Sequence, residues 1–437
     1  MNEIQREVCE AIDDRRDDMV EFLADLVSRK STPGNERVGQ ELMIERFEGM
    51  GLEPDVWDAD VDALRDHPGF FETTPYLEYG YEDRPNVAAV REGSGDGRSL
   101  ALSGHIDVVP VGDEDDWEYD PWDPTIEDGR MYGRGTNDMK SGIAAIVGAA
   151  EALDDVGVEL DGDFVLQTTI EEEAGGVGGV LSALERGYQP DGAIVTEPSG
   201  VPTIGVASAG VMYFRVTVEG RAAHTATKFL GRDAVGPALK IYEALEELDR
   251  ARKERISFEP AADQFPEAEG NVTNLAISSF QAGEWTSTVP PEAVMEWRIG
   301  WPPGETTEEV KAEVLETIDE VVENDEWLSA HPPEIEWFGW HTDPHELDRE
   351  SEIVEIAAGH AEEITGGERG WRGGLGGNDE RFYNRYYDIP CPSVGARGAN
   401  SHGADEWVEL DSLVDVAQTL ALTAMDWCGY DESSTHD

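Results

Sequence analysis

The sequence has few cysteines, few lysines and no long apolar run. Its three cysteines, Cys9, Cys391 and Cys428, show no paired spacing, which excludes a disulfide framework and a zinc site built from thiolates. No apolar stretch approaches the roughly 18 residues that a membrane span requires. The first residues lead directly into a charged segment. We therefore expect a cytoplasmic protein with no membrane partner.

Positive charge is also scarce. Only 32 Lys and Arg, six of them lysines, oppose 95 Asp and Glu, so the formal net charge is -63. The acids are spread through the predicted helices and loops instead of forming a tail, which is typical of a solvated acidic surface. Such a surface repels itself unless salt screens it, so the composition indicates a halophilic protein. It also argues against nucleic acid as a partner.

The apolar pattern divides the 437 residues into two predicted domains. Residues 1–208 and 341–437 alternate buried strands with helices, which predicts an α/β domain with a mostly parallel, helix-covered sheet. Residues 209–340 show strand, helix, two strands, helix and strand, which predicts an inserted α+β domain of ferredoxin-like topology. The expected elements include a helix over 3–30 and strands over 99–103, 163–170, 192–196 and 393–395.

Chemically active side chains follow the predicted strands of the first domain. In an open α/β sheet, ligands collect at the carboxyl edge, so side chains at these strand ends should lie close together. Imidazoles and carboxylates without thiolates suit zinc or another divalent first-row ion. From the residues alone, two interpretations stay equally open: these side chains form a metal site, or they are structural histidines and solvated acids. The candidate ligands are His105, Asp138, Glu173, Glu197 and His402.

Three adjacent glutamates, residues 171–173, follow the strand predicted over 163–170. Adjacent carboxylates repel one another, so one interpretation is a solvated acidic turn. The other interpretation divides the work, because side chains alternate along an extended chain: one Glu binds metal while its neighbour takes a proton from water. The glycines that follow lack the spacing of a nucleotide-binding loop, which argues against a phosphate site.

Together these motifs resemble the M20 family of metallopeptidases and aminoacylases, the group that includes acetylornithine deacetylase and succinyl-diaminopimelate desuccinylase. The resemblance covers nearly the whole chain and rests on SGHID at 103–107, GRGTNDMK at 133–140, EEEAGG at 171–176 and TEP at 196–198. It implies a zinc-peptidase-like catalytic domain that holds two divalent ions, zinc in the first place and cobalt or manganese as alternatives.

The resemblance also implies a role for each site residue. Asp107 would orient His105, and Glu172 would act as the general base, with Glu171 as the alternative one residue away. The implied metal ligands are His105 and Glu197 for one ion, Glu173 and His402 for the other, and Asp138 as the bridge between them.

The inserted domain resembles the family's lid and dimerisation domain, which implies a homodimer. His224, in GRAAHT at 220–225, would reach an active site, its own or that of the partner subunit, as a catalytic and substrate-binding residue that helps to hold the substrate carbonyl oxygen. Arg298 matches a lid arginine associated with the substrate carboxylate. Family members commonly carry Asn three residues before a proline; this chain carries Ser287 before Pro290, so Ser287 is the third candidate substrate-binding residue.

The implied reaction is hydrolysis of an amide bond, with water activated between two zinc ions and Glu172 as the base. The first interpretation is an N-acyl-amino-acid deacylase of the acetylornithine deacetylase or succinyl-diaminopimelate desuccinylase type, acting in amino-acid biosynthesis. A dipeptidase or carboxypeptidase of the same family is the second, and a non-catalytic binding protein of this fold is the third. The expected substrate is a small N-acyl amino acid or a short peptide.

Overall fold

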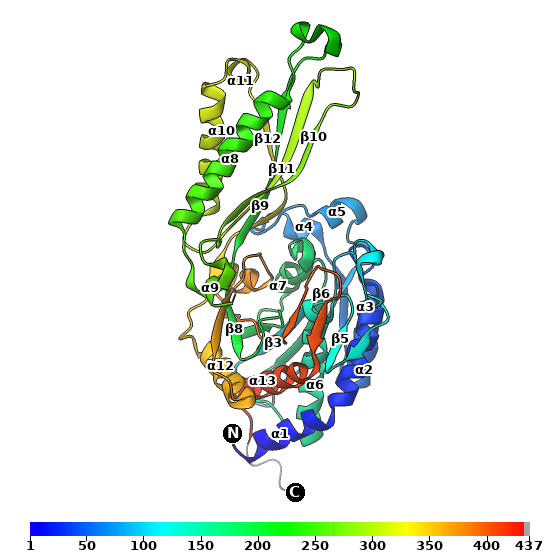
Figure 1. Ribbon diagram of the computed structural model, residues 1–437. Coiled ribbons are helices and arrows are strands. Elements are labelled where there is room, and N and C mark those ends of the chain that lie inside the picture. Colours follow the sequence, from blue (N-terminus) through cyan, green and yellow to red (C-terminus); the bar gives the residue numbers. More distant parts are fainter. Residues whose placement is uncertain (265, 432–437) are drawn as a thin grey trace. The chain divides into compact units, whose positions relative to one another are not determined.

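The computed structural model describes residues 1–264 and 266–431, and the chain divides into two compact units (Figure 1). The first unit contains residues 1–207, 346–372 and those from 378 onward, and the second contains residues 208–345 and 373–377. The return to the first unit lies at 345/346 instead of 340/341, because β12 (Glu334–Thr342) continues to pair with β9 as far as Thr342. Residues 373–377, predicted in the first domain, also belong to the second unit.

A five-stranded sheet in the order β1-β2-β6-β3-β7 forms the centre of the first unit. Strands β6, β3 and β7 are parallel, whereas β2 is antiparallel to β6 and β1 is antiparallel to β2. The α/β class is confirmed, and the sheet is mixed because the two short helices between β1 and β2 form no crossover. These elements are β1 (Asp55–Asp58), α4 (Val61–Leu64), α5 (Thr74–Tyr79), β2 (Pro85–Arg91), β3 (Leu100–His105), β6 (Phe164–Thr169) and β7 (Gly192–Val195).

Helices cover both faces of this sheet. Successive side chains of a strand point to opposite faces; Ala88 of β2 packs with Ala183 of α7, whereas Val87 and Ala89 belong to the main core. Helices α6 and α13 pack on each other and on β3. The helices of the first unit are α1 (Glu3–Asp14), α2 (Arg16–Ser28), α3 (Arg37–Gly49), α6 (Ser141–Val156), α7 (Ser182–Arg186), α12 (Glu352–Thr365) and α13 (Leu410–Cys428).

Two expected elements differ in the structure. The helix predicted over 3–30 is broken at Arg15, where ψ is 0° and the guanidinium contacts Glu151 and Asp155 of α6. The strand predicted over 393–395 consists of bridges at Ser393, which pairs with both Val195 and Gly205. In each case a contact with a distant segment decides the local conformation.

Two smaller sheets accompany the main sheet. One has the order β15-β16-β5-β4 and carries the loop from 400 to 406, which contains His402. The other has the order β13-β8-β14. Their strands are β4 (Thr125–Glu127), β5 (Arg130–Tyr132), β15 (Gly398–Ala399), β16 (Trp407–Glu409), β8 (Thr203–Ser208), β13 (His345–Glu346) and β14 (Gly370–Gly373).

The second unit is a four-stranded antiparallel sheet in the order β10-β11-β9-β12, with the chain order β-α-β-β-α-β. This is the predicted ferredoxin-like topology. Alternate residues of β9, including Met212, Phe214 and Val216, are buried in the core of this unit. Its elements are β9 (Gly210–Glu219), α8 (Val235–Arg255), α9 (Glu259–Gln264), β10 (Asn274–Ala282), β11 (Glu292–Trp301), α10 (Thr307–Glu323), α11 (Glu326–Ala330) and β12.

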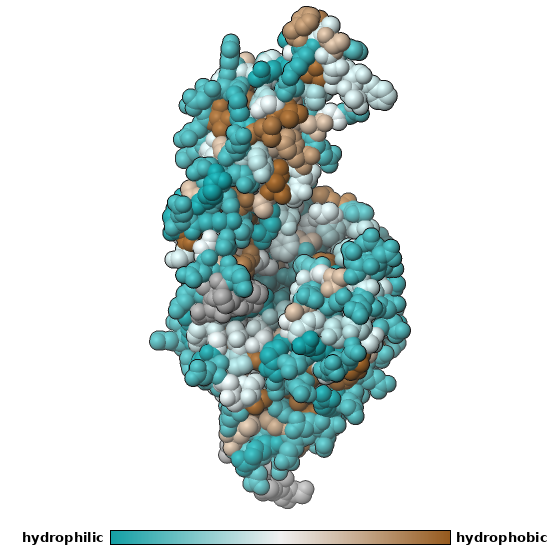
Figure 2. All heavy atoms as spheres, in the orientation of Figure 1, coloured by the Kyte–Doolittle hydropathy of each residue, from teal (hydrophilic) through white to brown (hydrophobic). Residues whose placement is uncertain are grey.

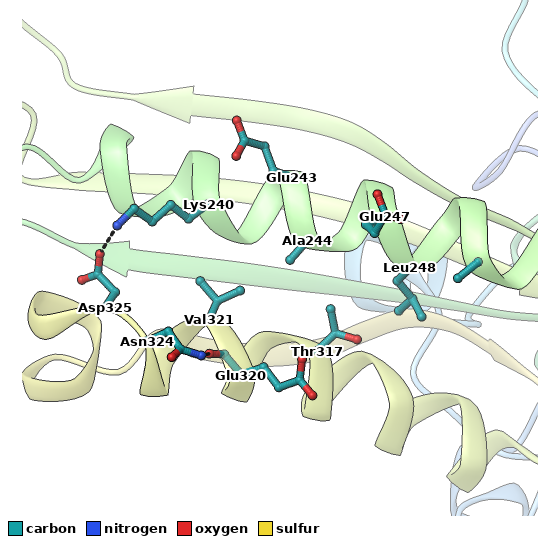
Figure 3. A pocket seen from close by; sticks show the side chains of 11 residues that line it. Lys240, Glu243, Ala244, Glu247, Leu248, Thr317, Glu320, Val321, Asn324 and Asp325 are labelled. Atoms are coloured by element: carbon teal, nitrogen blue, oxygen red, sulfur yellow. Dashed lines mark hydrogen bonds and ion pairs between the residues drawn. The ribbon is translucent and has the colours of Figure 1, made fainter.

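A groove runs between α8 and α10 of the second unit, and Lys240 spans one end of it to reach Asp325 at 2.6 Å (Figure 3). Acidic side chains, among them Glu243, Glu247 and Glu320, line the groove. Hydrophilic residues also cover most of the molecular face visible in Figure 2. None of the helices in the described part of the chain combines the length and the apolar character that a membrane span needs.

Candidate metal centre

Three neighbouring parallel strands end at one edge of the main sheet, and each is followed by a candidate ligand. The central strand, β3, ends at His105. On one side, β6 leads into the short helix η3 (Glu172–Ala174), and on the other, β7 leads to Glu197. Ser103 pairs with Val195, so His105 and Glu197 each lie two residues beyond the same level of the sheet. The strand order therefore gathers side chains that are distant in sequence.

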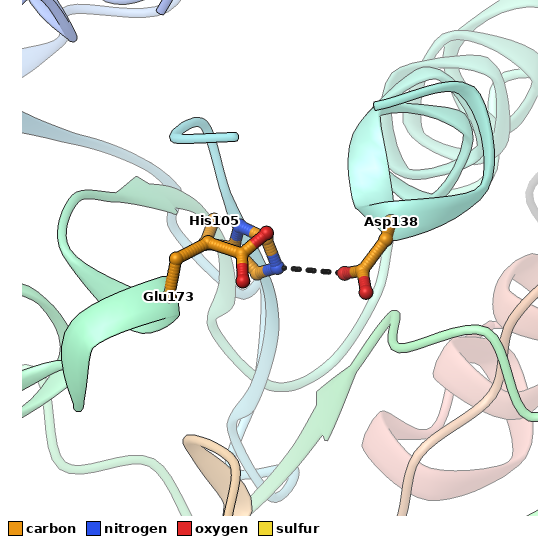
Figure 4. A group of neighbouring side chains, drawn as sticks. All are labelled: His105, Asp138 and Glu173. Carbon is orange, nitrogen blue, oxygen red and sulfur yellow. Dashed lines mark hydrogen bonds and ion pairs between the residues drawn. The ribbon is translucent and has the colours of Figure 1, made fainter. Parts of the chain in front are cut away.

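Asp138 lies between the two histidines, with one carboxylate oxygen toward each. Its Oδ1 is 3.2 Å from His105 Nε2, the interaction drawn as a dashed line in Figure 4, and its Oδ2 is 3.5 Å from His402 Nε2. His402 Nε2 is also 2.9 Å from Glu173 Oε2. Asp138 belongs to the turn η2 (Thr136–Lys140), which leads directly into α6. Two strand ends, a turn and a distant loop thus meet at one carboxylate.

The second group around His105 contains Glu172 and Glu197. His105 Nε2 is 3.6 Å from Glu197 Oε1 and 3.8 Å from Glu172 Oε2. Two groups of three residues each place their ligand atoms within 4.8 Å of one another. One group is His105, Asp138 and Glu173, and the other is His105, Glu172 and Glu197. The five predicted ligands and the predicted base are therefore brought together in one cluster.

Asp107 contacts the cluster through both its main chain and its side chain. Its backbone carbonyl accepts a hydrogen bond from His105 Nδ1 at 2.9 Å, which leaves the Nε2 lone pair directed at the carboxylates. The Asp107 carboxylate is 3.6 Å from the same nitrogen and instead accepts the backbone N–H groups of Glu172 and Glu173, at 3.3 and 3.1 Å. Asp107 therefore orients an imidazole with its carbonyl and holds the glutamate turn with its carboxylate.

The charges of the cluster fit divalent cations. Burial and the nearby Asp138 raise the pKa of Glu197 to about 8, and burial and Glu197 raise the pKa of Glu172 well above its usual range. Hydrogen bonds with Asp138 and Glu173 raise the pKa of His402 to about 10. Negative charge thus exceeds what two imidazoles neutralise, and a metal ion would displace the protons that the cluster attracts. Nitrogen and carboxylate donors suit zinc and its first-row neighbours.

Glu406 supports the cluster and was not predicted. It is fully buried, and its carboxylate accepts the backbone N–H groups of Gly135, Asn137 and Asp138 at 2.9–3.1 Å. It also accepts Arg134 Nη1 at 2.5 Å. These bonds hold the turn that presents Asp138. Because acids occur throughout this chain, one more acid after His402 gave no usable signal.

Glu171, the alternative base, lies outside the ligand cluster. Its carboxylate is buried and is occupied by donors from Thr73, Tyr81 and the backbone of Gly178. The side chains of Glu171 and Glu172 thus go to different environments, as expected, but the reason is not alternation along an extended chain: Glu171 has a left-handed backbone and Glu172 begins η3. Thr73 and Tyr81 come from the segment between β1 and β2, which carries none of the predicted site residues.

The predicted substrate-binding residues all lie in the second unit, and the structure brings two of their segments together. His224 pairs with Thr288 as a bridge, and the Thr225 N–H donates to the Ser287 carbonyl at 3.0 Å. Arg298 lies on β11 six residues beyond Glu292, about 20 Å along the strand. It donates to the Leu375 carbonyl at 3.3 Å. Within this unit, Arg298 is therefore separate from the His224 and Ser287 segments.

A comparison with protein-family models finds a match to "Peptidase family M20/M25/M40" over residues 101–426, about three quarters of the chain. The chain belongs to peptidase family M20. As an M20 member it is a metal-dependent hydrolase of amide or peptide bonds, and the imidazole and carboxylate cluster at the sheet edge lies within the matched residues.

Relatives of this M20 chain differ in the substrates that their names give. This chain is 28% identical over 381 residues to the N-formyl-4-amino-5-aminomethyl-2-methylpyrimidine deformylase of Halalkalibacterium halodurans. The match covers 80% of this chain and 84% of the relative. Among solved structures, the dipeptidase Dug1p of Saccharomyces cerevisiae has a TM-score of 0.75 at 15% identity, with 98% and 99% of the two chains covered. A Staphylococcus aureus tripeptidase has a TM-score of 0.71 at 20% identity, covering 94% and 98%. The structural likenesses establish the M20 fold.

Proposed function

We propose that this M20 protein is a zinc-dependent deacylase that hydrolyses the amide bond of a small N-acylated amine, with an N-acyl amino acid as the first substrate class. The observation that carries the proposal is the arrangement around Asp138, which faces one histidine with each carboxylate oxygen. The likeness to a deformylase over 80% of the chain favours removal of an acyl group over cleavage between two amino acids.

The proposed ligands divide between two divalent ions, as the family resemblance implies. His105 and Glu197 would hold one ion and Glu173 and His402 the other, with Asp138 between them. Bound zinc would supply Lewis-acid activation of the water and of the substrate carbonyl. Cobalt or manganese would offer the same donors a similar charge.

Glu172 is the proposed general base. Its side chain is buried beside His105 and Glu197. Thr73 and Tyr81 donate to the neighbouring Glu171 and not to Glu172. In this role it takes the proton of the attacking water and returns it to the leaving amine. Asp107 holds the backbone of this turn, so the base and its neighbour Glu173 keep a fixed orientation.

We further propose substrate contacts and a homodimer through the second unit. His224, Arg298 and Ser287 are the proposed contacts for the substrate carbonyl and carboxylate. Phe229, Leu230 and Trp285 of this unit are 81%, 61% and 73% exposed, which favours a second copy as their cover. Sedimentation equilibrium in molar KCl tests the dimer, and a monomer at micromolar concentration would contradict it.

A substrate panel tests the function. Zinc- or cobalt-loaded protein in molar KCl is assayed with N-formyl, N-acetyl and N-succinyl amino acids, with N-formylated aminomethylpyrimidine, and with dipeptides and tripeptides. We expect kcat/KM for at least one acylated amine to exceed that for every peptide by about 100-fold or more, equivalent to about 3 kcal/mol of transition-state binding. Faster cleavage of a dipeptide would instead make the protein a dipeptidase or carboxypeptidase, the second candidate.

The Glu172→Gln variant tests the base assignment. Gln keeps the size of the side chain but cannot accept the proton of water, so we expect kcat to fall by about 100- to 10,000-fold. Metal content, measured by mass spectrometry after desalting, should remain that of the unmodified protein. Normal hydrolysis by this variant would show that another group is the base.

A further inference from the structure

Glu171 is enclosed by donors although it stands next to the proposed base. Its side chain is fully buried. Oε1 accepts the Thr73 hydroxyl at 2.5 Å, and Oε2 accepts the Tyr81 hydroxyl at 2.9 Å and the Gly178 N–H at 2.8 Å. Both carboxylate oxygens are thus satisfied by groups from two other segments of the chain. A side chain bound in this way does not rotate without breaking three hydrogen bonds.

The backbone of Glu171 makes the reversal that aims the next two glutamates. Its φ of 67° lies in the left-handed region, which residues other than glycine rarely adopt. Its carbonyl accepts the N–H groups of Ala174 and Gly176, at 3.1 and 2.7 Å. The chain leaves β6 and turns into η3 at this residue. The directions of Glu172 and Glu173 therefore depend on a conformation that Glu171 must hold.

A buried arginine, Arg84, lies between Glu171 and a second buried carboxylate, that of Glu36. The Arg84 guanidinium is 3.7 Å from Glu171 Oε1, and it also binds the Glu36 carboxylate through Nε and Nη2 at 2.5–3.2 Å. Arg84 and Glu36 are 2% and 0% exposed. The guanidinium thus lies between two buried carboxylates, those of Glu36 and Glu171, and adds a third contact on the Glu171 side chain.

We propose that Glu171 is a positioning residue for the metal centre: Thr73, Tyr81 and Arg84 hold its side chain so that its left-handed backbone directs Glu172 and Glu173 to the sheet edge. The inference rests on the proposed function, since it assigns a purpose to those two side chains. It also gives the segment from residue 73 to residue 84 a task, namely to enclose Glu171. Together with the Asp107 carboxylate, which binds the same turn through Glu172 N and Glu173 N, it fixes the turn from two sides.

The Glu171→Gly variant separates the side chain from the backbone conformation. Glycine adopts a φ of 67° without steric cost, so this change removes the three hydrogen bonds but not the turn's preferred conformation. Glu171→Gln keeps the size and removes the charge beside Arg84. Tyr81→Phe keeps the ring and removes one donor. Glu151→Gln is the matched control, because Glu151 is also a buried glutamate, bound by Arg15 and Arg46 at 2.6 and 2.7 Å.

The test loads each purified variant with Co²⁺ and records its visible absorption spectrum, its Co²⁺ affinity, and kcat and KM for the best substrate of the unmodified protein. We expect Glu171→Gly and Glu171→Gln to fold, by circular dichroism, but to lose about 10- to 100-fold in Co²⁺ affinity and kcat, with an altered spectrum and little change in KM. Tyr81→Phe should change the same quantities several-fold. Glu151→Gln should lower the melting temperature and leave the spectrum and affinity unchanged.

Folded Glu171→Gly and Glu171→Gln proteins with the unmodified spectrum, affinity and kcat would overturn the proposal. If neither protein folds, Tyr81→Phe decides, and an unchanged spectrum and affinity in that variant would overturn it. An unmodified protein that binds Co²⁺ but hydrolyses no amide would contradict the proposed function instead. In that case the spectra and affinities still decide whether Glu171 positions the ligands.

Discussion

The two histidines of the candidate metal centre are held in opposite ways. His105 ends β3, the middle one of the three parallel strands, its side chain is 0% exposed, and its Nδ1 is bonded to the Asp107 carbonyl. His402 lies in the loop between β15 and β16, its side chain is 54% exposed, and its φ is 63°. The regular sheet supports the first, whereas a left-handed loop supports the second. One half of the centre is therefore rigid by construction, and the other depends on a few loop contacts.

Those loop contacts come from other short segments of the first unit. The Asp405 carboxylate accepts the N–H groups of Glu118 and Tyr119, at 2.8 and 3.2 Å. Asn137 Nδ2 donates to Ser401 Oγ at 2.7 Å. Asn137 precedes Asp138, so the loop of His402 is fastened to the turn that carries the shared carboxylate. We infer that an ion held by His402 exchanges faster than one held by His105.

Replacing each histidine by alanine gives the largest expected contrast. His105→Ala breaks a buried set of imidazole–carboxylate contacts and should lower the free energy of unfolding of the metal-free protein by about 3 kcal/mol or more. His402→Ala removes a half-exposed group and should cost about 1 kcal/mol or less. Urea unfolding with chelator at fixed salt measures both.

Activity and metal content sharpen the same contrast. Both alanine variants should lose most of their turnover, because each removes a proposed ligand. Graded chelation followed by metal analysis should show that His402→Ala keeps one ion per chain tightly, whereas His105→Ala keeps none. Equal losses of stability and of metal from the two variants would mean that burial does not distinguish the two halves.

Salt should have a smaller effect on stability, because it screens the charges on the exposed surface. The formal net charge of -63 is screened over about 8 Å at physiological ionic strength and about 3 Å at 1 M. We expect the melting temperature of the metal-loaded protein to rise on the order of 10 °C between 0.2 and 3 M KCl. Scanning calorimetry measures this, with sucrose of equal osmolality as the control. A melting temperature that is constant across this range would contradict a halophilic surface.

The smallest expected effect concerns the backbone at His402. His402→Gly removes the proposed ligand and also relieves the left-handed φ of 63°. The metal-free glycine variant should therefore be more stable than His402→Ala by about 0.5–1 kcal/mol, and both should be inactive. Paired urea unfolding curves measure the difference. A glycine variant less stable than the alanine variant would show that the loop holds φ without strain.

Much of the fold could be predicted because its signals are local. Short apolar runs with an acid or histidine at their ends marked β3, β6 and β7, and the change from buried runs to alternation marked the second unit. The break at Arg15 and the bridges at Ser393 could not be predicted, since both depend on partners more than 100 residues away. The antiparallel edge of the sheet was missed for a similar reason, because the direction of β2 is set by its pairing with β6.

The candidate site shows the same division. Residue types and spacing placed His105, Asp138, Glu173, Glu197 and His402 in one hypothesis, but spacing alone left a metal site and solvated acids equally open. The supporting contacts were harder to predict from the sequence: Asp107 binds His105 through its backbone carbonyl, and Glu406 binds the turn of Asp138. In a chain with 95 acids, composition does not distinguish a buried carboxylate that accepts four hydrogen bonds from one in water.

The sequence by itself determined which side chains stand at the strand ends and which chemistry they offer, because periodicity and residue type are properties of neighbouring residues. Only the tertiary structure decided that β3 lies between β6 and β7, that His105 is buried while His402 is half-exposed, and that Glu171 faces Thr73 and Tyr81 while Glu172 faces the cluster. The physical reason is that strand order, burial and side-chain partners are set by contacts between distant segments. No local pattern encodes those contacts.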